Sequence, residues 1–485
     1  MRPCNDLNTN LCRRVVMALG FALPGVISAA GMAGAESAVA PASMLPIRDP
    51  MTTSNPFGWL RSFTSTGSIA TDNAFFQSLG TNGRSCNTCH RQEDAWSITP
   101  ASVRARFQAT AGADPIFRSN DGSNSPLADV STVDKRRSAY SMLLGKGVIR
   151  VGIGIPANAE FTLDSVVDPY GFASASELSL FRRPLPSTNL AFLTGVMWDA
   201  RETVAPFLPP MDAGVGQANL VASLRHQVLD ATLGHAQAVI APDDEQIDQI
   251  VRFELGLTTA QIRDNRAGFL NEDDAIGGPR ILANQRFHVG INDTLGADPT
   301  LVAFNPQSMM LFSAWSAGDD RNRPSPSRDR ESIARGEQLF NSKPIAITRV
   351  GGLNDALDMP VIAGTCTTCH NAPNVGNHTV ALPLDLGLTD ASRRTPDMPL
   401  YTLRNTGTGE IRQTTDPGRA LLTGRWKDIG KFKGPVLRGV VAHAPYFHNG
   451  SAASLEDVVE FYDSRFMIGL TAQENRDLVA FLRAL

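Results

Sequence analysis

The clearest helix signal in the sequence lies at the carboxyl end of the chain. Apolar residues recur there at intervals of three and four, the spacing that places side chains on one face of an α-helix. Thr471 stands three residues before Glu474, and this capping-box arrangement predicts that the helix begins at this point. We therefore expect a closing helix whose apolar face comprises Leu478, Phe481, Leu482 and Leu485.

A second capping box, Ser454 with Asp457, predicts another helix shortly before the first. Its apolar positions, at i, i+3, i+4 and i+7, are Leu455, Val458, Val459 and Tyr462. Tyr462 is therefore expected to face the interior.

Three further segments are predicted to be helical, at about 332–340, 73–79 and 220–238. In the last of these, Gln227 and His235 lie eight residues apart and so share one helix face. Glycine and proline are frequent between residues 110 and 175, which predicts loops or short strands there. The whole pattern indicates a mainly α fold.

The amino-terminal segment, residues 1–35, has the pattern of a secretory signal peptide. A basic start is followed by an apolar stretch over 15–30 and by Ala-Gly-Ala at 33–35, a small-residue cleavage site. An uncleaved membrane anchor is the alternative, which Pro24, the scattered glycines and the small-residue end disfavour. No later stretch is long enough to span a membrane, so we expect a periplasmic protein without a membrane span.

Composition narrows the possible partners. The formal net charge is -4 and the isoelectric point is near 6.1, which gives no electrostatic basis for binding nucleic acid or an anionic membrane. With 485 residues, 42% of them hydrophobic, the chain is long enough for two or three domains with buried cores.

Four of the six cysteines form two copies of one motif, Cys86-Asn-Thr-Cys89-His90 and Cys366-Thr-Thr-Cys369-His370. Each motif offers two thiols to bond the vinyl groups of one haem and an adjacent histidine to ligate its iron. Zinc and redox chemistry are the alternatives for a Cys-x-x-Cys pair, and the histidines and the export signal disfavour both. Cys4 and Cys12 lie in the signal peptide, which leaves no cysteine for a disulfide. We therefore expect two covalently bound haem c groups, with iron ligands His90 and His370.

A polar segment separates the two motifs. Residues 319–331 are densely charged and contain two prolines, as in an interdomain linker. We predict two cytochrome c-like haem domains, the N-terminal one enlarged by loop-rich insertions. The predicted limits are 1–35 for the signal peptide, 36–58 for an N-terminal extension, 59–322 for the N-terminal haem c domain and 323–485 for the C-terminal cytochrome c domain.

Two segments resemble the bacterial di-haem cytochrome c peroxidase and MauG family. Residues 431–463, which contain Ala-Pro-Tyr-Phe-His at 444–448, are similar to the C-terminal signature of that family. Residues 182–202, which contain Trp198-Asp-Ala-Arg201, resemble its Trp-Asp-Gly-Arg motif. The resemblance implies one haem that activates hydrogen peroxide or oxygen and a second haem that relays electrons.

The resemblance also assigns roles near the first haem. His90 is followed by no histidine until His226, which favours an iron with an open coordination position. Trp198 is expected to carry electrons between the haems. It lies 108 positions after His90, so we expect an insertion in this interval that shapes access to the first haem.

Two glutamines bear on the chemistry at that haem. Gln227 matches a distal-side glutamine of the family, and Gln237 stands where the family has a glutamate that helps to cleave the O–O bond. Glutamine donates hydrogen bonds but does not shuttle protons at neutral pH. Either the nearby His235 takes the acid/base role, or the protein is not an efficient peroxidase.

At the second haem, the family places the distal ligand fourteen residues after the histidine of Pro-Tyr-Phe-His. That position is Tyr462, with His443 or His448 as the alternative ligand. A phenolate stabilises ferric iron and should lower the reduction potential.

Family members also hold a calcium ion between the haem domains, partly through backbone oxygens of the segment that matches Pro445. The matching asparagine ligand is Arg183 in this chain. A fixed positive charge opposes a divalent cation, which puts calcium in doubt.

Three functions remain open. The leading one is a periplasmic di-haem oxidoreductase of the peroxidase kind, which uses hydrogen peroxide or oxygen and receives electrons from a small c-type cytochrome or cupredoxin. The second is a pure electron-transfer cytochrome, in which His226, His235, His288 or Met197 would cap the first iron. The third is an oxygenase for an organic substrate, similar to the di-haem rubber-cleaving enzymes, or a MauG-like oxidase of a partner protein.

Overall fold

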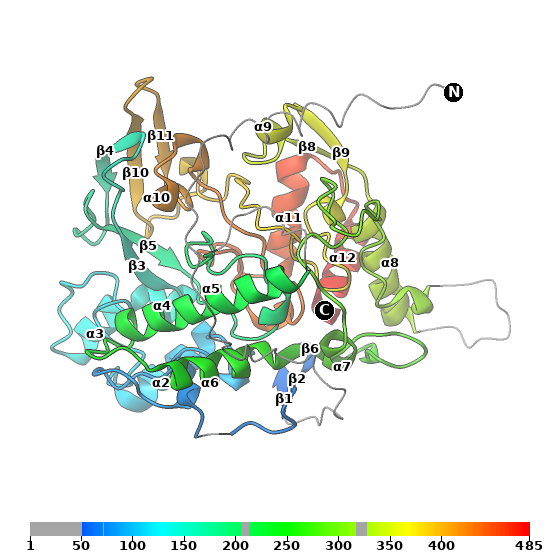
Figure 1. Ribbon diagram of the computed structural model, residues 1–485, viewed down its shortest axis with the longest axis horizontal. Helices are drawn as coiled ribbons and strands as arrows, with labels where there is room; N and C mark the ends of the chain where they lie inside the picture. Colours follow the sequence, from blue (N-terminus) through cyan, green and yellow to red (C-terminus); the bar gives the residue numbers. More distant parts are fainter. Residues whose placement is uncertain (1–50, 71, 205–212, 317–326) are drawn as a thin grey trace, which may run out of the picture. The chain divides into compact units, whose positions relative to one another are not determined.

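Three helices organise the carboxyl-terminal part of the chain: α8 (Arg328–Ser342), α11 (Leu455–Phe466) and α12 (Ala472–Ala484) (Figure 1). Thr471 accepts a hydrogen bond from the backbone N–H of Glu474 at 3.2 Å, and Ser454 begins α11 in the same way. Both predicted capping boxes and their helices are confirmed. Residues 332–340, also predicted to be helical, lie within α8.

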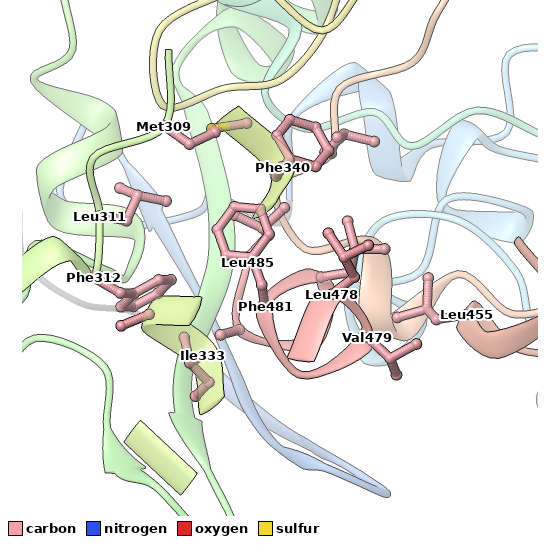
Figure 2. Close-up of a cluster of buried hydrophobic side chains, with 14 of the residues drawn as sticks. Met309, Leu311, Phe312, Ile333, Phe340, Leu455, Leu478, Val479, Phe481 and Leu485 are labelled. Atoms are coloured by element: carbon pink, nitrogen blue, oxygen red, sulfur yellow. The ribbon is translucent and has the colours of Figure 1, made fainter. Parts of the chain in front are cut away.

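These helices pack around one apolar cluster (Figure 2). Phe481 is fully buried, and its ring lies 5.4 Å from that of Phe340 on α8. A methyl group on Gly336 would overlap the backbone of Asp477, so glycine allows the close approach of α8 to α12. Truncating a buried phenylalanine in such a core costs about 3–5 kcal/mol.

The computed structural model describes residues 51–485 apart from 71, 205–212 and 317–326. All of these residues fall in one compact unit, Pro46–Leu485. The predicted signal peptide lies outside the described residues, as does most of the linker predicted at 319–331. The last residues of that linker are helical, because α8 begins at Arg328. The domain limits stay predictions.

Strands contribute more than the sequence pattern indicated. A four-stranded sheet has the order β1 (Met51–Asn55), β2 (Gly58–Thr64), β6 (Leu257–Asp264) and β7 (Gly268–Phe269). A three-stranded sheet has the order β11 (Ile411–Thr414), β10 (Leu400–Asn405) and β4 (Phe161–Val167). Two-stranded sheets are formed by β3 (Ile149–Ile153) with β5 (Leu178–Arg182), and by β8 (Ile345–Thr348) with β9 (Val361–Gly364).

The prediction of a mainly α fold is therefore only partly confirmed. The pairing of β4 with β10 joins segments more than 230 residues apart, one on each side of the predicted linker, and each strand leaves one face partly exposed. Such long-range pairing leaves no mark in the local pattern of a single strand.

The interval between His90 and Trp198, where an insertion was expected, forms regular helices and strands. It contains α2 (Pro100–Thr110), α3 (Val133–Ala139), α4 (Ser141–Lys146) and the strands β3, β4 and β5. Short strands were predicted between 110 and 175, whereas α3 and α4 were not. The other α-helices of the described residues are α5 (Ala213–Gly234), α6 (Asp244–Leu255), α7 (Pro279–Ala283), α9 (Asn354–Leu357) and α10 (Ala420–Thr423).

Two other helix predictions need correction. The segment 73–79 holds only a short 3-10 helix, Ala74–Phe76, begun by Asn73. The helix predicted at 220–238 is α5, which ends at Gly234. His235 and Gln237 therefore follow α5 instead of lying on its face. Gly234 is the residue type that commonly ends helices, so the sequence carried this signal.

Candidate active site

The two Cys-x-x-Cys-His motifs fold into the same local structure. Each begins with a 3-10 helix, Cys86–Thr88 in the first motif and Cys366–Thr368 in the second. In both, the histidine N–H donates to the carbonyl of the first cysteine, at 2.9 Å and 3.0 Å. A threonine hydroxyl, Thr88 or Thr368, accepts a hydrogen bond from the backbone N–H three residues earlier. The two motifs therefore hold their cysteine pairs and their histidines in equivalent positions.

The histidines are prepared for metal ligation in the same way. His90 Nδ1 lies 3.1 Å from the carbonyl of Trp96, and His370 Nδ1 lies 2.6 Å from that of Gly376. An Nδ1–H that donates to a carbonyl leaves Nε2 as the electron-pair donor for iron. Burial lowers the pKa of His90 to about 4 and also lowers that of His370, which keeps both rings neutral. The residues therefore fit a haem at each motif.

A large pocket opens at the first motif. It encloses about 1360 Å³, including the space at its mouth, and its walls include Cys86, Cys89 and His90. Because both cysteines and the histidine of the motif line it, the pocket lies where a haem bonded to them would sit.

Three of the four predicted catalytic residues line this pocket: Trp198, Gln227 and His235. Gln237 does not. Its side chain is exposed, and its amide oxygen accepts a hydrogen bond from Asn82 at 3.2 Å. The structure thus does not bring Gln237 into the pocket with the others, because the chain leaves the helical path after Gly234 and Gln237 adopts a left-handed conformation, with φ of 53°.

Trp198 is fixed at a tight turn. Its indole N–H donates to the carbonyl of Arg183 at 2.7 Å, and its ring lies edge-on to His448 with centroids 6.3 Å apart. The next residue, Asp199, forms a buried ion pair with Arg182 at 2.6 Å. Arg182 also pairs with Asp416, at 2.7 Å, so the turn is tied to the C-terminal part of the chain.

Of the four candidate ligands of the first iron, two line the pocket and two do not. His226 pairs with Glu202 at 2.6 Å and is not in the pocket wall, and His288 lies 3.4 Å from Asp298, also away from the pocket. Met197 and His235 do line the pocket.

Sequence reasoning missed three charged residues of the pocket wall, Arg84, Asp121 and Glu254. Asp121 lies 2.5 Å from His235 Nδ1 and 2.5 Å from Arg84 Nη1. Asp121 is on an irregular segment, between α2 and α3, where no periodic pattern marks which side chains turn inward.

At the second motif, Tyr462 extends from α11 and packs in the same apolar cluster as Cys366 and Cys369. Burial, with smaller contributions from the two thiols, raises the pKa of its phenol. Among the described residues, none forms a hydrogen bond with its hydroxyl group. The ring thus lies beside the haem attachment site with its oxygen unpaired by protein, as the predicted ligand role requires.

Of the two alternative ligands, His448 is buried and His443 is partly buried. Burial lowers the pKa of His443 to about 3 and that of His448 to about 4. His448 stacks on Phe432 with ring centroids 4.1 Å apart, and neither of its ring nitrogens has a hydrogen-bond partner.

Arg183 lies at the segment expected to hold calcium. The side chain is 4% exposed, and burial lowers its pKa to about 10. It donates to four backbone carbonyls, those of Lys146, Gly147, Ile98 and His443, at 2.9, 3.2, 2.9 and 3.3 Å. The guanidinium thus occupies a cluster of carbonyl oxygens from three separate segments.

Comparisons with known proteins test the resemblance to the bacterial di-haem cytochrome c peroxidase and MauG family. Residues 431–466 match the family model described as RoxA-like, cytochrome c-like. The chain is 33% identical over 190 residues to cytochrome-c peroxidase IdrP1 of Denitromonas iodatirespirans, which covers 36% of this chain and 44% of that protein. It is 32% identical over 126 residues to cytochrome c551 peroxidase of Nitrosomonas europaea, which covers 25% of this chain and 30% of that protein.

The predicted resemblance to the bacterial cytochrome c peroxidases is confirmed. The matched region spans less than half the length of these curated relatives. Among solved structures, a MauG-like protein associated with microbial copper homeostasis aligns over 86% of this chain and 91% of its own, with a TM-score of 0.35 and 15% identity. Within the described part of the chain, no helix combines the length and apolar character needed to cross a membrane.

Proposed function

We propose that this protein is an exported di-haem c oxidoreductase of the cytochrome c peroxidase and MauG kind. The haem on Cys86 and Cys89 activates hydrogen peroxide or oxygen, and the haem on Cys366 and Cys369 relays electrons. The observation that carries the proposal is the pocket at the first motif, where Gln227 and His235 share the wall with His90.

The chain's own residues divide the work at the first site. His90 holds the cofactor from one side through Nε2. When bound, the haem supplies an iron that binds peroxide or oxygen and exchanges electrons with it. The amide of Gln227 would donate a hydrogen bond to a peroxide or oxygen molecule in the pocket, and the apolar wall residues would limit water at the site.

Electrons reach the first site by way of Trp198. An indole ring is more easily oxidised than an aliphatic side chain, and Trp198 is fixed edge-on to the buried ring of His448. At the second site, His370 and Tyr462 would both hold the iron, His370 through Nε2 and Tyr462 through its phenol oxygen. The donor is a small periplasmic c-type cytochrome or cupredoxin.

A second candidate function is an oxygenase for an organic substrate. One observation favours it: the apolar side chains of Ile149 and Val151, from the inserted strand β3, lie in the pocket wall.

One experiment tests the proposal. Electronic absorption and EPR spectra of the oxidised protein are recorded before and after adding hydrogen peroxide. We expect one high-spin and one low-spin haem, with the high-spin signals lost on peroxide addition. Two low-spin haems and no reaction would establish the electron-transfer alternative. A high-spin haem that is inert to peroxide but consumes oxygen with an added organic substrate would favour the oxygenase.

A further inference from the structure

His235, Asp121 and Arg84 form a hydrogen-bonded series in the wall of the first pocket, in which Asp121 and Arg84 are buried and the side chain of His235 is 39% exposed. The His235 Nδ1 to Asp121 Oδ2 distance is 2.5 Å, and the Arg84 Nη1 to Asp121 Oδ1 distance is also 2.5 Å. Arg84 is held in turn by the carbonyls of Pro115 and Ile116, at 2.8 and 2.7 Å. The series therefore cannot rearrange without breaking several bonds.

The charge state of Asp121 fixes the orientation of His235. Asp121 is 6% exposed, and burial alone would raise its pKa; the hydrogen bond from His235 and the charge of Arg84 hold that pKa below its ordinary value. An ionised carboxylate only accepts hydrogen bonds. His235 Nδ1 must therefore be the donor, which leaves Nε2 as the atom able to accept or release a proton inside the pocket.

Other charged groups of the pocket belong to different elements. Arg182, Arg183 and Arg201 lie in the wall on the side of Trp198, and Glu254 of α6 lies next to Cys86. His235 also influences the first motif, because its charge contributes to the lowered pKa of His90, after the larger effect of burial. None of these other groups bonds to the ring of His235, which is hydrogen-bonded to Asp121.

We propose that His235 is the proton-transferring group of this pocket and that Asp121, held by Arg84, is its positioning residue. The inference rests on the proposed peroxide chemistry. His235 Nε2 takes the proton from one oxygen of hydrogen peroxide and returns it to the other as the O–O bond breaks, so that oxygen leaves as water. Overall, one peroxide, two protons and two electrons give two waters, with the electrons supplied by the donor cytochrome or cupredoxin. A histidine–carboxylate pair thus does the work that Gln237 cannot do.

The chain offers a matched control for this pair. His226 also binds a buried carboxylate through Nδ1, that of Glu202 at 2.6 Å, but lies outside the pocket wall. His226→Gln therefore perturbs an equivalent pair without touching the pocket. The test variants are His235→Gln and Asp121→Asn, which preserve approximate shape.

Two readouts are followed from pH 4 to 9: the rate of reaction with hydrogen peroxide, and the rate of cyanide binding to the oxidised protein. Hydrogen cyanide must lose its proton to bind as the anion, so its binding reports the pocket base without any turnover. We expect His235→Gln to slow both rates about 10²- to 10⁴-fold. Asp121→Asn removes the carboxylate that accepts from Nδ1 and holds the ring in one orientation, so it should slow both rates by a smaller factor than His235→Gln does. His226→Gln should match the parent.

Equal rates and pH profiles in the parent, His235→Gln and Asp121→Asn would overturn the inference while leaving the proposed function intact. A first haem that is low-spin in the parent and becomes high-spin in His235→Gln would also overturn it, because His235 would then be an iron ligand. A parent protein that neither binds cyanide nor reacts with peroxide would overturn the proposed function itself. If Asp121→Asn fails to fold, the cyanide profile of His235→Gln against His226→Gln decides the case.

Discussion

The first and second haem motifs share a turn and differ in the residues that line their surroundings. At the first, His90 faces a large pocket whose wall carries Gln227, His235 and the two charged residues bonded in series to His235, Asp121 and Arg84. At the second, the cysteines pack against Tyr462 and aliphatic side chains in an apolar cluster. The same five-residue unit is therefore placed once beside an open space with proton-handling groups and once beside a potential oxygen ligand.

The comparison separates two determinants of haem chemistry. Attachment is local: two thiols, a histidine and a carbonyl six residues later are enough, and both motifs have them. In the proposed function, reactivity depends on residues farther along the sequence, such as Asp121 at the first site and Tyr462 at the second. A variant at one site should therefore leave the other site unchanged, which makes each haem an internal control.

The largest expected effect comes from removing attachment at one site. Cys366→Ser with Cys369→Ser should leave one haem on the chain after denaturation, because thioether bonds survive it. Mass spectrometry and haem staining measure the loss. Cys86→Ser with Cys89→Ser serves as the reciprocal control, and a parent protein carrying fewer than two haems would contradict the assignment.

The next effect concerns the pH dependence of stability. Burial raises the pKa of Glu254, at the first site, to about 8 from 4.5. Below pH 4.5 the carboxyl is neutral in both folded and unfolded protein. As pH rises from there to about 8, the unfolded chain ionises first, so Glu254 makes folding progressively less favourable.

Glu254→Gln should therefore stabilise the protein on the order of a few kcal/mol at pH 8 and hardly at all at pH 4. Denaturant unfolding at both pH values measures the difference. An equal effect at the two pH values would show that Glu254 is ionised or paired in the folded protein. Glu245→Gln, on the exposed face of α6, is the control.

At the second site, Tyr462→Phe removes the phenol oxygen while keeping the ring. Loss of a hard anionic donor should raise the reduction potential of the second haem by about 0.1 V and change its spectrum. Spectroelectrochemical titration measures both, and the first haem should not respond. Tyr446→Phe, another buried tyrosine of this part, is the control. Unchanged values in Tyr462→Phe would leave His443 or His448 as the ligand.

The smallest expected effect tests the connection between the sites. Trp198→Phe keeps an aromatic ring but removes the easily oxidised indole and its bond to the Arg183 carbonyl. Electron exchange between the haems should slow about tenfold, equivalent to about 1.4 kcal/mol in the barrier. Rapid-mixing reduction kinetics measure the rate, with Trp426→Phe as a distant control. An unchanged rate would remove Trp198 from the electron path.

Features defined by short segments could be predicted from the sequence. The haem motifs and the capping boxes at Ser454 and Thr471 each involve neighbours within five residues, and all are present as expected. The inward position of Tyr462 followed from the period of a single helix. These features depend on backbone geometry that a few residues determine by themselves.

Features that depend on contacts between residues far apart in the sequence could not be predicted. The partner of His235 comes from a residue 114 positions earlier, on a segment without regular structure. The pairing of β4 with β10 likewise joins distant segments. The position of Gln237 was mispredicted for a different reason, since Gly234 ends α5 and turns the following residues out of the helical path.

Near Trp198, the side chain of Arg183 joins three separate segments of the chain at one junction. A bound ion could join them too, but its effect on stability would depend on ion concentration. Occupancy of an ion site follows mass action, so its contribution to stability rises and falls with the concentration of free ion. A guanidinium that belongs to the chain has no dissociation constant: it gathers the carbonyls of Ile98, Lys146, Gly147 and His443 whenever the protein folds. Formation of this junction is therefore independent of the supply of free ions.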